Sequence, residues 1–230
     1  MPNSTDVWGV RADSWRMVCS TPPFLQFRSA ILEAARPDPH KVLLDLGAGT
    51  GLVALAAAER CGEVHAVDSS PKMVEILSDE ARRRRLGNVH AVEADMRRLP
   101  IGDQSVDIVT SCYALHHLSD DGKELVAAEA MRVLRPGGRL VIVDMMFRLS
   151  FARRDRQIVA SKVLMLARKG PSGLLRIARN GGRVLAGRWE QPAPLEWWRE
   201  MLAGRGFDAV QLRPLVHEAG IAYAERPQVQ

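Results

Sequence analysis

The sequence has 230 residues, and 47% of them are apolar, which suffices for one substantial core and gives no sign of a second domain. Its three cysteines lie in or beside apolar segments and are odd in number, which favours a reduced cytoplasmic protein over a disulfide framework. The first ten residues lack the basic segment followed by an apolar segment that marks a secretory signal peptide. No apolar run approaches the roughly 20 residues that cross a bilayer. We therefore expect a cytoplasmic protein, and peripheral attachment to the inner face of the membrane remains open.

The first predicted element is a helix that Thr21 can cap, that opens on Pro22 and Pro23, and that stops at Pro37. Aromatic residues are concentrated in and before this helix: Trp8, Trp15, Phe24 and Phe27. Taken by themselves, such rings are typical of anchors in a hydrophobic core.

The most informative segment is a strand predicted over 41–46 that runs into a turn with glycines at positions 47, 49 and 51. Glycine permits positive φ and lets a ligand lie against bare main chain. The apolar run that follows predicts a helix over 52–60, whose first amides point back at the turn. The pattern therefore predicts a site for a nucleotide-like ligand.

The glycine spacing leaves two ligands and a ligand-free turn as alternatives. A dinucleotide fold has G-x-G-x-x-G, whereas this turn has G-x-G-x-G. Asp68 ends the strand predicted over 63–68, where its oxygens could accept hydrogen bonds from a ribose in either ligand. Asp45 distinguishes a dinucleotide from a nucleoside with an amino-acid tail, because a carboxylate beside the turn repels a pyrophosphate and attracts an ammonium group. The sequence thus favours a nucleoside with a zwitterionic amino-acid tail.

The rest of the chain continues the alternation of strands and helices. In the central part, the expected elements are a helix from Ser70 closed by Gly87 and Asn88, strands over 89–93 and 106–112, and a helix over 120–134. A turn at 136–138 and a strand over 139–145 follow. The C-terminal part is expected to contain a helix with Trp197 and Trp198 and strands over 207–212 and 219–224. We expect an α/β protein with a Rossmann-like, doubly wound sheet of seven strands, five parallel and then an antiparallel pair.

Four segments in this order resemble the successive motifs of class I S-adenosylmethionine-dependent methyltransferases: Leu43 to Gly51, Ala66 to Ser70, Glu93 to Asp95, and Leu134 to Leu140. Within that family the chain is most similar to the group containing the ubiquinone and menaquinone C-methyltransferases and the bacterial phospholipid N-methyltransferases. Three further segments carry that likeness: Leu99 to Ile101, Ser105 to Val109, and Ala114 to Leu118.

The resemblance implies S-adenosyl-L-methionine as the cofactor and assigns its site residue by residue. The expected cofactor-binding residues are Asp45, Gly47, Ala48, Gly49, Gly51, Asp68, Ser69, Met73, Asp95, Met96 and Ser111. Asp45 would hold the ammonium group directly or through water, and Asp68 the ribose hydroxyls. Asp95 would take the adenine amino group and Met96 the ring face. In related enzymes an N-terminal segment like residues 1–38 folds over the cofactor as a lid.

The expected catalytic residues are Tyr113 and His116, while His117 and Asp144 could also assist an amine acceptor that must lose a proton. A structural or cofactor-side role for the His-His-Leu pattern is the alternative. No metal motif is recognised, and in-line transfer from a sulfonium needs mainly alignment, so no metal is expected.

Residues 147–190 form a basic insert with eleven Lys or Arg against two acids, a net charge of +9 in a chain whose total is +5, so that the rest sums to −4. Apolar residues recur between these charges at helical spacing. The insert is either a helical cap on the core or a contact with an anionic lipid surface; nucleic acid is disfavoured because few aromatic residues lie among the arginines.

We therefore expect one methyltransferase domain divided into an N-terminal lid (1–38), a cofactor-binding core (39–146), a basic helical insert (147–190) and a C-terminal helix and strand pair (191–230). The predicted activity is methylation of a membrane-associated lipid, first of all N-methylation of a phosphatidylethanolamine-type headgroup. C-methylation of a prenylated quinol and methylation of a soluble small molecule are the alternatives. The sequence does not fix an oligomeric state.

Overall fold

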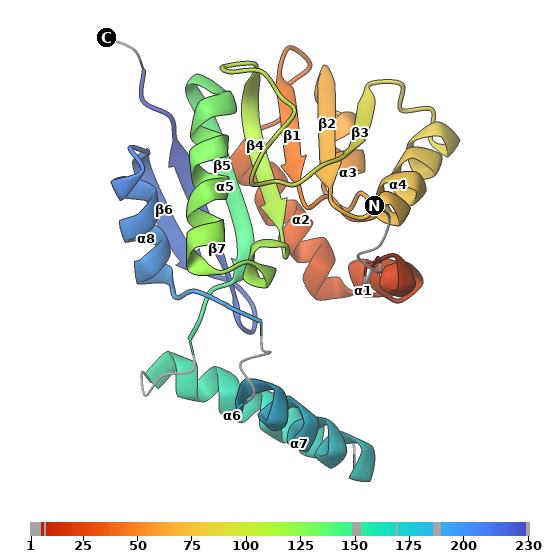
Figure 1. Cartoon of the computed structure of the whole chain (residues 1–230), viewed down its shortest axis with the longest axis vertical. Helices are drawn as coiled ribbons and strands as arrows, with labels where there is room; N and C mark the ends of the chain where they lie inside the picture. The colour runs from red at the N-terminus through yellow and green to blue at the C-terminus, as the bar shows by residue number, and fades with distance from the viewer. Residues whose placement is uncertain (1–5, 7, 149–152, 169, 186–189, 229–230) are drawn as a thin grey trace.

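The computed structural model describes residues 6, 8–148, 153–168, 170–185 and 190–228. Within these residues, seven strands form a sheet in the order β3-β2-β1-β4-β5-β7-β6 (Figure 1). The strands are β1 (Val42–Leu46), β2 (Glu63–Asp68), β3 (Val89–Glu93), β4 (Val106–Cys112), β5 (Leu134–Met145), β6 (Asp208–Pro214) and β7 (Ala219–Glu225). The first five are parallel, and β7 pairs antiparallel with β5 and β6. The predicted fold class is confirmed.

Helices cover both faces of this sheet (Figure 1). They are η1 (Gly9–Arg11), α1 (Ala12–Cys19), α2 (Pro22–Ala35), α3 (Ala54–Ala58), α4 (Pro71–Arg83), η2 (Leu115–His117), α5 (Asp120–Val133), α6 (Arg153–Ala167), α7 (Pro171–Leu185) and α8 (Leu195–Gly204). The core between the sheet and α2, α3 and α4 contains Leu43, and the core beneath α5 and α8 contains Leu44. These neighbours belong to different cores because side chains alternate between the two faces along a strand.

The strand order reverses next to β1, which lies between β2 on one side and β4 on the other. The connections that follow β1 and β4 therefore leave the sheet in opposite directions. In open α/β sheets this switch point is where ligands bind, beyond the carboxyl ends of the strands. The fold thus places the glycine turn after β1 at the expected position for a ligand.

Local sequence signals account for some of the helix boundaries. Thr21 precedes α2 as expected but does not cap it through its side chain, because its hydroxyl donates to the carbonyl of Val18 (2.7 Å). The side chain of Ser70 accepts a hydrogen bond from Met73 N (3.2 Å) and caps α4. The predicted end of this helix at Gly87 and Asn88 is too late, because α4 ends at Arg83 and Arg85 takes a left-handed φ of 60°. The amide of Leu86 then bonds back to the carbonyl of Ala81, so the arginine serves where glycine was expected.

The basic insert contains two helices, α6 and α7, which pack on each other and project away from the sheet (Figure 1). Because β5 leads into this hairpin, it lies beyond the carboxyl ends of the parallel strands, on the same side as α1. Arg154 holds its base to the core by donating to the carbonyl of Met146 (2.6 Å). Across the described ranges, no helix combines the length and the apolar character needed to cross a bilayer.

Candidate active site

The turn after β1 has the open main chain that its glycines predict. Gly47, Gly49 and Gly51 adopt φ values of 64°, 53° and 92°, which L-residues with side chains rarely take. A Cβ on Gly47 would come within 2.4 Å of the Cβ of Ala114, and one on Gly49 within 3.0 Å of Trp15 Nε1. A side chain at either position would collide with these neighbours, and both glycines present their main chain to the cavity beside the turn.

Asp68 ties this turn to the start of α4. One carboxylate oxygen accepts from Gly49 N (2.8 Å) and the other from Ser70 N (2.9 Å). Burial raises the pKa of Asp68, and these two hydrogen bonds oppose the rise. Asp68 also lines the cavity beside the turn, so the same carboxylate both shapes the glycine loop and faces a ligand. Its predicted bond to a ribose stays a prediction.

Asp45 lies beneath the turn, and it is not among the residues that line the cavity. Its side chain is 2% exposed and accepts from Thr110 Oγ1 (2.7 Å) and from Ala54 N (3.1 Å). Burial raises the pKa of Asp45 to about 7, against the effect of these hydrogen bonds. The carboxylate joins β1, β4 and α3, and its predicted role toward an ammonium group stays a prediction.

The expected adenine side of the cavity is formed by Ser69, Met73 and Met96, all three of which line it. Asp95 does not line it and pairs with Arg97 (2.6 Å), whose hydrogen bonds lower the pKa of Asp95. The predicted contact of Asp95 with the adenine amino group therefore requires the carboxylate to be shared with, or released by, its arginine.

Ser111, one of the expected cofactor-binding residues, is not among the residues that line the cavity, and its predicted role stays a prediction. Its hydroxyl donates to the carbonyl of Leu46 (3.0 Å), and its side chain is fully buried beneath α5 and α8 beside Trp198. The alternation of side chains along β4 explains this placement, because Ser111 shares a face with Val109. Ala48 is similarly a structural member of the turn, buried and bonded to the carbonyl of Val67.

Aromatic residues from the N-terminal segment form one wall of the cavity, which Trp8 and Trp15 line. Trp15 meets Phe24 edge to face at 5.3 Å, and Phe27 stacks on Tyr113 at 5.2 Å with an interplanar angle of 12°. Core anchoring and cavity formation were both open from the sequence, and the structure divides these rings between the two roles.

The residues after β4 bring an aromatic ring and two imidazoles to the opposite wall. Tyr113 has a φ of 56°, an uncommon conformation for a tyrosine that turns the chain over the end of the strand. Asp144, at the end of β5, accepts from the amide of Leu115 (2.7 Å) and bonds to His116 Nδ1 (2.6 Å). The His117 ring packs on Trp8 at 4.5 Å and lines the cavity, whereas His116 lies behind it.

Electrostatics separates the roles of these groups. Burial disfavours the charged form of His116, but the charge and hydrogen bond of Asp144 outweigh it and raise the pKa of His116. The pKa of His117 is lowered by desolvation and then by His116, so His117 is a neutral imidazole near pH 7. Burial and the neighbouring Glu218 raise the pKa of Tyr113, which keeps the phenol protonated. His117 thus offers this wall a neutral imidazole nitrogen that can accept a hydrogen bond.

Together these elements enclose a cavity of about 270 Å³. Its lining residues are Trp8, Trp15, Gly47, Gly49, Asp68, Ser69, Met73, Met96, Tyr113, Ala114, His117 and Leu118. Six of the eleven predicted cofactor-binding residues line it, and so does Tyr113 of the two predicted catalytic residues. The cavity opens beside the point where the strand order reverses, and it combines bare main chain, a strand-end acid and thioether and indole surfaces.

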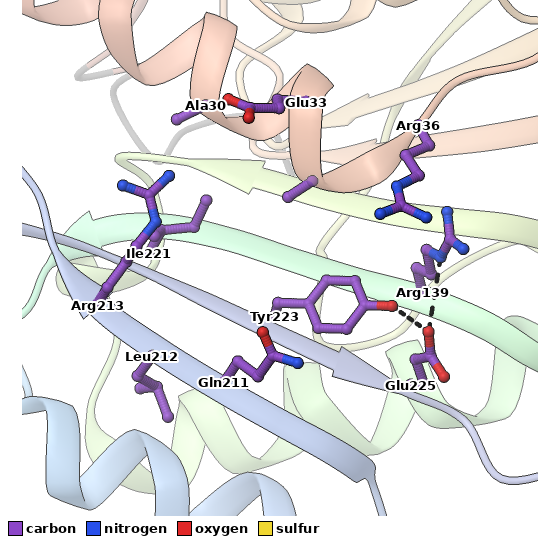
Figure 2. A pocket seen from close by; sticks show the side chains of 11 residues that line it. Ala30, Glu33, Arg36, Arg139, Gln211, Leu212, Arg213, Ile221, Tyr223 and Glu225 are labelled. Carbon is purple, nitrogen blue, oxygen red and sulfur yellow. Dashed lines mark hydrogen bonds and ion pairs between the residues drawn. The ribbon is translucent and has the colours of Figure 1, made fainter.

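A larger hollow of about 410 Å³ lies elsewhere, between α2 and strands β6 and β7 (Figure 2). It contains none of the predicted site residues. Figure 2 shows Arg139 and Tyr223 both directed at Glu225, so the carboxylate of Glu225 is already partnered. Chemistry and position, rather than size, therefore identify the cavity at the glycine turn as the candidate active site.

The fold and this site have the features expected of a class I methyltransferase domain. Residues 43–138 match the family described as a methyltransferase domain. The resemblance drawn from the sequence motifs is thereby confirmed.

Curated relatives match the same region. The chain is 41% identical over 105 residues to an uncharacterized methyltransferase, YcgJ, of Bacillus subtilis, covering 46% of this chain and 40% of that protein. It is 38% identical over 122 residues to the demethylmenaquinone methyltransferase of Thermus thermophilus, covering 52% and 54%. The chain thus spans about half the length of these relatives or less.

Solved structures show the same fold over more of the chain. The Bacillus subtilis YcgJ structure superposes with a TM-score of 0.64 at 20% identity, over 89% of this chain and 99% of that one. Phosphoethanolamine N-methyltransferase 2 of Haemonchus contortus, in complex with S-adenosyl-L-methionine, superposes with a TM-score of 0.72 at 16% identity, over 98% and 59%. The predicted cofactor agrees with the ligand of that structure.

Proposed function

We propose that this protein transfers a methyl group from S-adenosyl-L-methionine to a membrane-associated lipid, and that the first acceptor to test is the amine of a phosphatidylethanolamine-type headgroup. The proposal has two parts, the transfer reaction and the membrane-bound acceptor. The cavity supports the first part, and the helical hairpin of α6 and α7 supports the second.

The residues present fit the cofactor. When bound, it supplies an activated methyl group on a sulfonium that carries its own leaving group. Gly47 and Gly49 offer main chain where a Cβ would fill the space, and Asp68 offers an acceptor to hydroxyl groups. Met73 and Met96 offer polarisable surface for a flat ring. Trp8 and Trp15 offer indole surface on one wall of the cavity.

Tyr113 and His117 border the side on which an acceptor would enter. His117, neutral near pH 7, can accept a hydrogen bond from an ammonium headgroup and orient its nitrogen. His116 and Asp144 act behind it, since Asp144 fixes the ring of His116 and the main chain at Leu115. Alignment is the main task of such a site, because holding reactants in line supplies much of the rate of a displacement.

One observation carries the lipid part of the proposal: both ends of the basic hairpin lie at the acceptor side of the cavity. Ile158 of α6 packs with Met145 and Phe147, and Tyr113 borders this cluster. At the other end, the amide of Gln191 donates to the carbonyl of His116 (2.7 Å). A surface that holds the hairpin would therefore lie next to the entrance for the acceptor.

The hairpin has the chemistry of a membrane contact. Its described exposed apolar side chains are Val163, Leu164, Met165, Leu174 and Leu175, and they lie among exposed arginines such as Arg168, Arg176 and Arg179. Each Lys or Arg near an anionic surface contributes about 1 kcal/mol, and exposed apolar side chains can enter the interface. Of the residues that defined the basic and apolar pattern, Phe151, Lys169 and Arg188 lie outside the described residues, as do the side chains of Lys162, Arg183, Val184 and Leu185.

We expect the full chain to float with vesicles of phosphatidylcholine and phosphatidylglycerol, and much less with phosphatidylcholine alone. The double variant Arg176→Glu/Arg179→Glu should lose most of this binding, because four units of charge change at the surface. The matched variant Arg82→Glu/Arg83→Glu changes the same charge on exposed side chains of α4 and should keep it. Equal flotation with neutral and anionic vesicles would remove the lipid argument.

The acceptor itself is identified by incubating cellular lipid extracts with methyl-labelled cofactor and analysing the products by mass spectrometry. Label in monomethylated or dimethylated phosphatidylethanolamine supports the first proposal. The relative named demethylmenaquinone methyltransferase favours a second candidate, C-methylation of a prenylated quinol, and label in the quinone fraction would support that instead. Label only in water-soluble compounds would contradict both.

A further inference from the structure

Two adjacent histidines and one glutamate from a distant part of the chain meet at the edge of the cavity. His116 and His117 lie on η2, and Glu190 begins the segment that returns from the basic hairpin. One ligand atom from each of these three side chains lies within 4.8 Å of the others. The hydrogen bond from Gln191 N to the carbonyl of His116 (2.7 Å) fixes the return segment beside η2.

A further carboxylate orients one of the histidines in the manner of many metal sites. Asp144 bonds to Nδ1 of His116 (2.6 Å), which leaves Nε2 as the nitrogen available to a ligand. The same carboxylate is held by the amides of Leu115 (2.7 Å) and Met145 (2.6 Å), so it is fixed before any ion arrives. A carboxylate behind the ring fixes the tautomer and raises the basicity of a metal-binding imidazole.

We propose that His116, His117 and Glu190 bind a divalent first-row transition metal ion, with Zn²⁺ as the best match. Two imidazole nitrogens and one carboxylate oxygen are a ligand set that such ions prefer, and three protein ligands leave a coordination position open. Tetrahedral zinc with bonds of about 2.1 Å separates its ligand atoms by about 3.4 Å, so ligand atoms that now lie within 4.8 Å of one another need to approach by at most about 1.4 Å.

The position of this site relates it to the cavity. His117 lines the cavity, so the open coordination position can take water or an oxygen of a molecule bound there. A neutral imidazole has one acceptor nitrogen, so binding the ion and accepting a hydrogen bond from the methyl acceptor are alternative uses of His117. The ammonium group of the nearby Lys123 is paired with Asp120 (2.9 Å) and also donates to the carbonyl of Leu118 (3.0 Å). The metal would also tie the return segment of the hairpin to η2. The proposal does not depend on which acceptor is methylated.

A second arrangement of the same residue types provides a matched control. His65 and His90 both contact Oε1 of Glu63, at 3.2 and 3.4 Å, at the outer part of β2 and β3. Here no buried carboxylate stands behind either ring among the described contacts. Surface histidines of this kind are the common source of unspecific metal binding, and they test whether any binding belongs to the proposed site.

The test uses untagged full-length protein titrated with Zn²⁺ by calorimetry and with Co²⁺ by visible absorption. We expect one ion per chain and the intense ligand-field bands of four-coordinate Co²⁺. Removing a residue that only hydrogen-bonds to a metal ligand typically lowers metal affinity by about 10- to 100-fold. Glu190→Gln and His117→Gln remove ligands themselves, so each should weaken Zn²⁺ binding by at least that much. His90→Gln should leave the affinity unchanged, and circular dichroism should show all variants folded.

Absence of stoichiometric binding, or an affinity that falls with His90→Gln and not with Glu190→Gln, would overturn the metal site. Affinity for S-adenosyl-L-methionine is measured on the same samples. If the wild-type protein binds the cofactor but no metal, this inference alone is refuted. If the wild-type protein does not bind the cofactor, the proposed function is refuted.

Discussion

Replacing Asp144 by alanine is expected to lower the free energy of unfolding by about 3–5 kcal/mol, the cost of removing one partner from a buried ion pair. Asp144 is 1% exposed, His116 is 5% exposed, and their side chains are 2.6 Å apart. Without the carboxylate, His116 and the amides of Leu115 and Met145 are left buried with no acceptor. Urea denaturation followed by tryptophan fluorescence measures the effect.

The control is Asp103→Ala. Asp103 forms an ion pair of similar length with Arg132 (2.7 Å), but its side chain is 73% exposed. An exposed pair contributes at most about 1 kcal/mol, so this variant should stay close to wild type. Equal losses in Asp103→Ala and Asp144→Ala would contradict the buried-pair argument.

The stabilisation by this pair should also depend on pH. The pKa of His116 is raised above 6.5, so its contribution is complete below pH 6.5 and is lost as the pH rises through the raised value. Burial raises the pKa of Asp144, but His116 and the amide hydrogen bonds lower it below 3.8, so its contribution is lost only as the pH falls through that lowered value. The wild-type advantage over Asp144→Ala should therefore be largest between pH 3.8 and 6.5 and should decline as the pH rises through the raised pKa of His116.

Replacing Asp68 by alanine is expected to weaken binding of S-adenosyl-L-methionine by about tenfold or more, through loss of charge-assisted hydrogen bonds. The structure adds a second cause. The carboxylate also holds Gly49 N and Ser70 N, so the variant loosens the glycine turn and the start of α4. Isothermal titration calorimetry with the cofactor and with S-adenosylhomocysteine measures both affinities.

Asp79→Ala provides the comparison for Asp68→Ala, since Asp79 pairs with Arg82 at the exposed surface of α4, away from the cavity lining. Its cofactor affinity should equal that of wild type. Asp68→Asn, which keeps an oxygen for one of the two amides, should fall between them. Unchanged affinity in Asp68→Ala would refute the binding role of this residue.

Much of the cofactor-binding half was predictable because its signals are local. Glycines 47 and 49 adopt the positive φ that their spacing indicates, and Asp68 stands where β2 ends. Ser70 caps α4 as expected. Each of these features depends on a few consecutive residues, so periodicity and turn chemistry suffice to locate it.

Some of the expected site residues do not line the cavity, because lining depends on where a side chain points. Ser111 stands at the expected end of β4, but the pleat turns it to the face beneath α5 and α8. Asp45 precedes the turn as expected, yet it bonds to Thr110 and Ala54 inside the core. Nothing in the sequence near Glu190 indicates that it reaches His116 and His117, since that approach depends on the path of the whole hairpin.

The sequence by itself determined the order of strands and helices, the glycine turn, the strand-end acid at Asp68 and the concentration of positive charge between β5 and α8, because short-range patterns specify all of them. Only the tertiary structure decided that Trp8 and Trp15 line the cavity, that Asp144 fixes His116, and that the two ends of the basic hairpin lie beside Tyr113 and His116. The physical reason is that these contacts join residues far apart in the chain, and packing of the complete sheet is what brings them together.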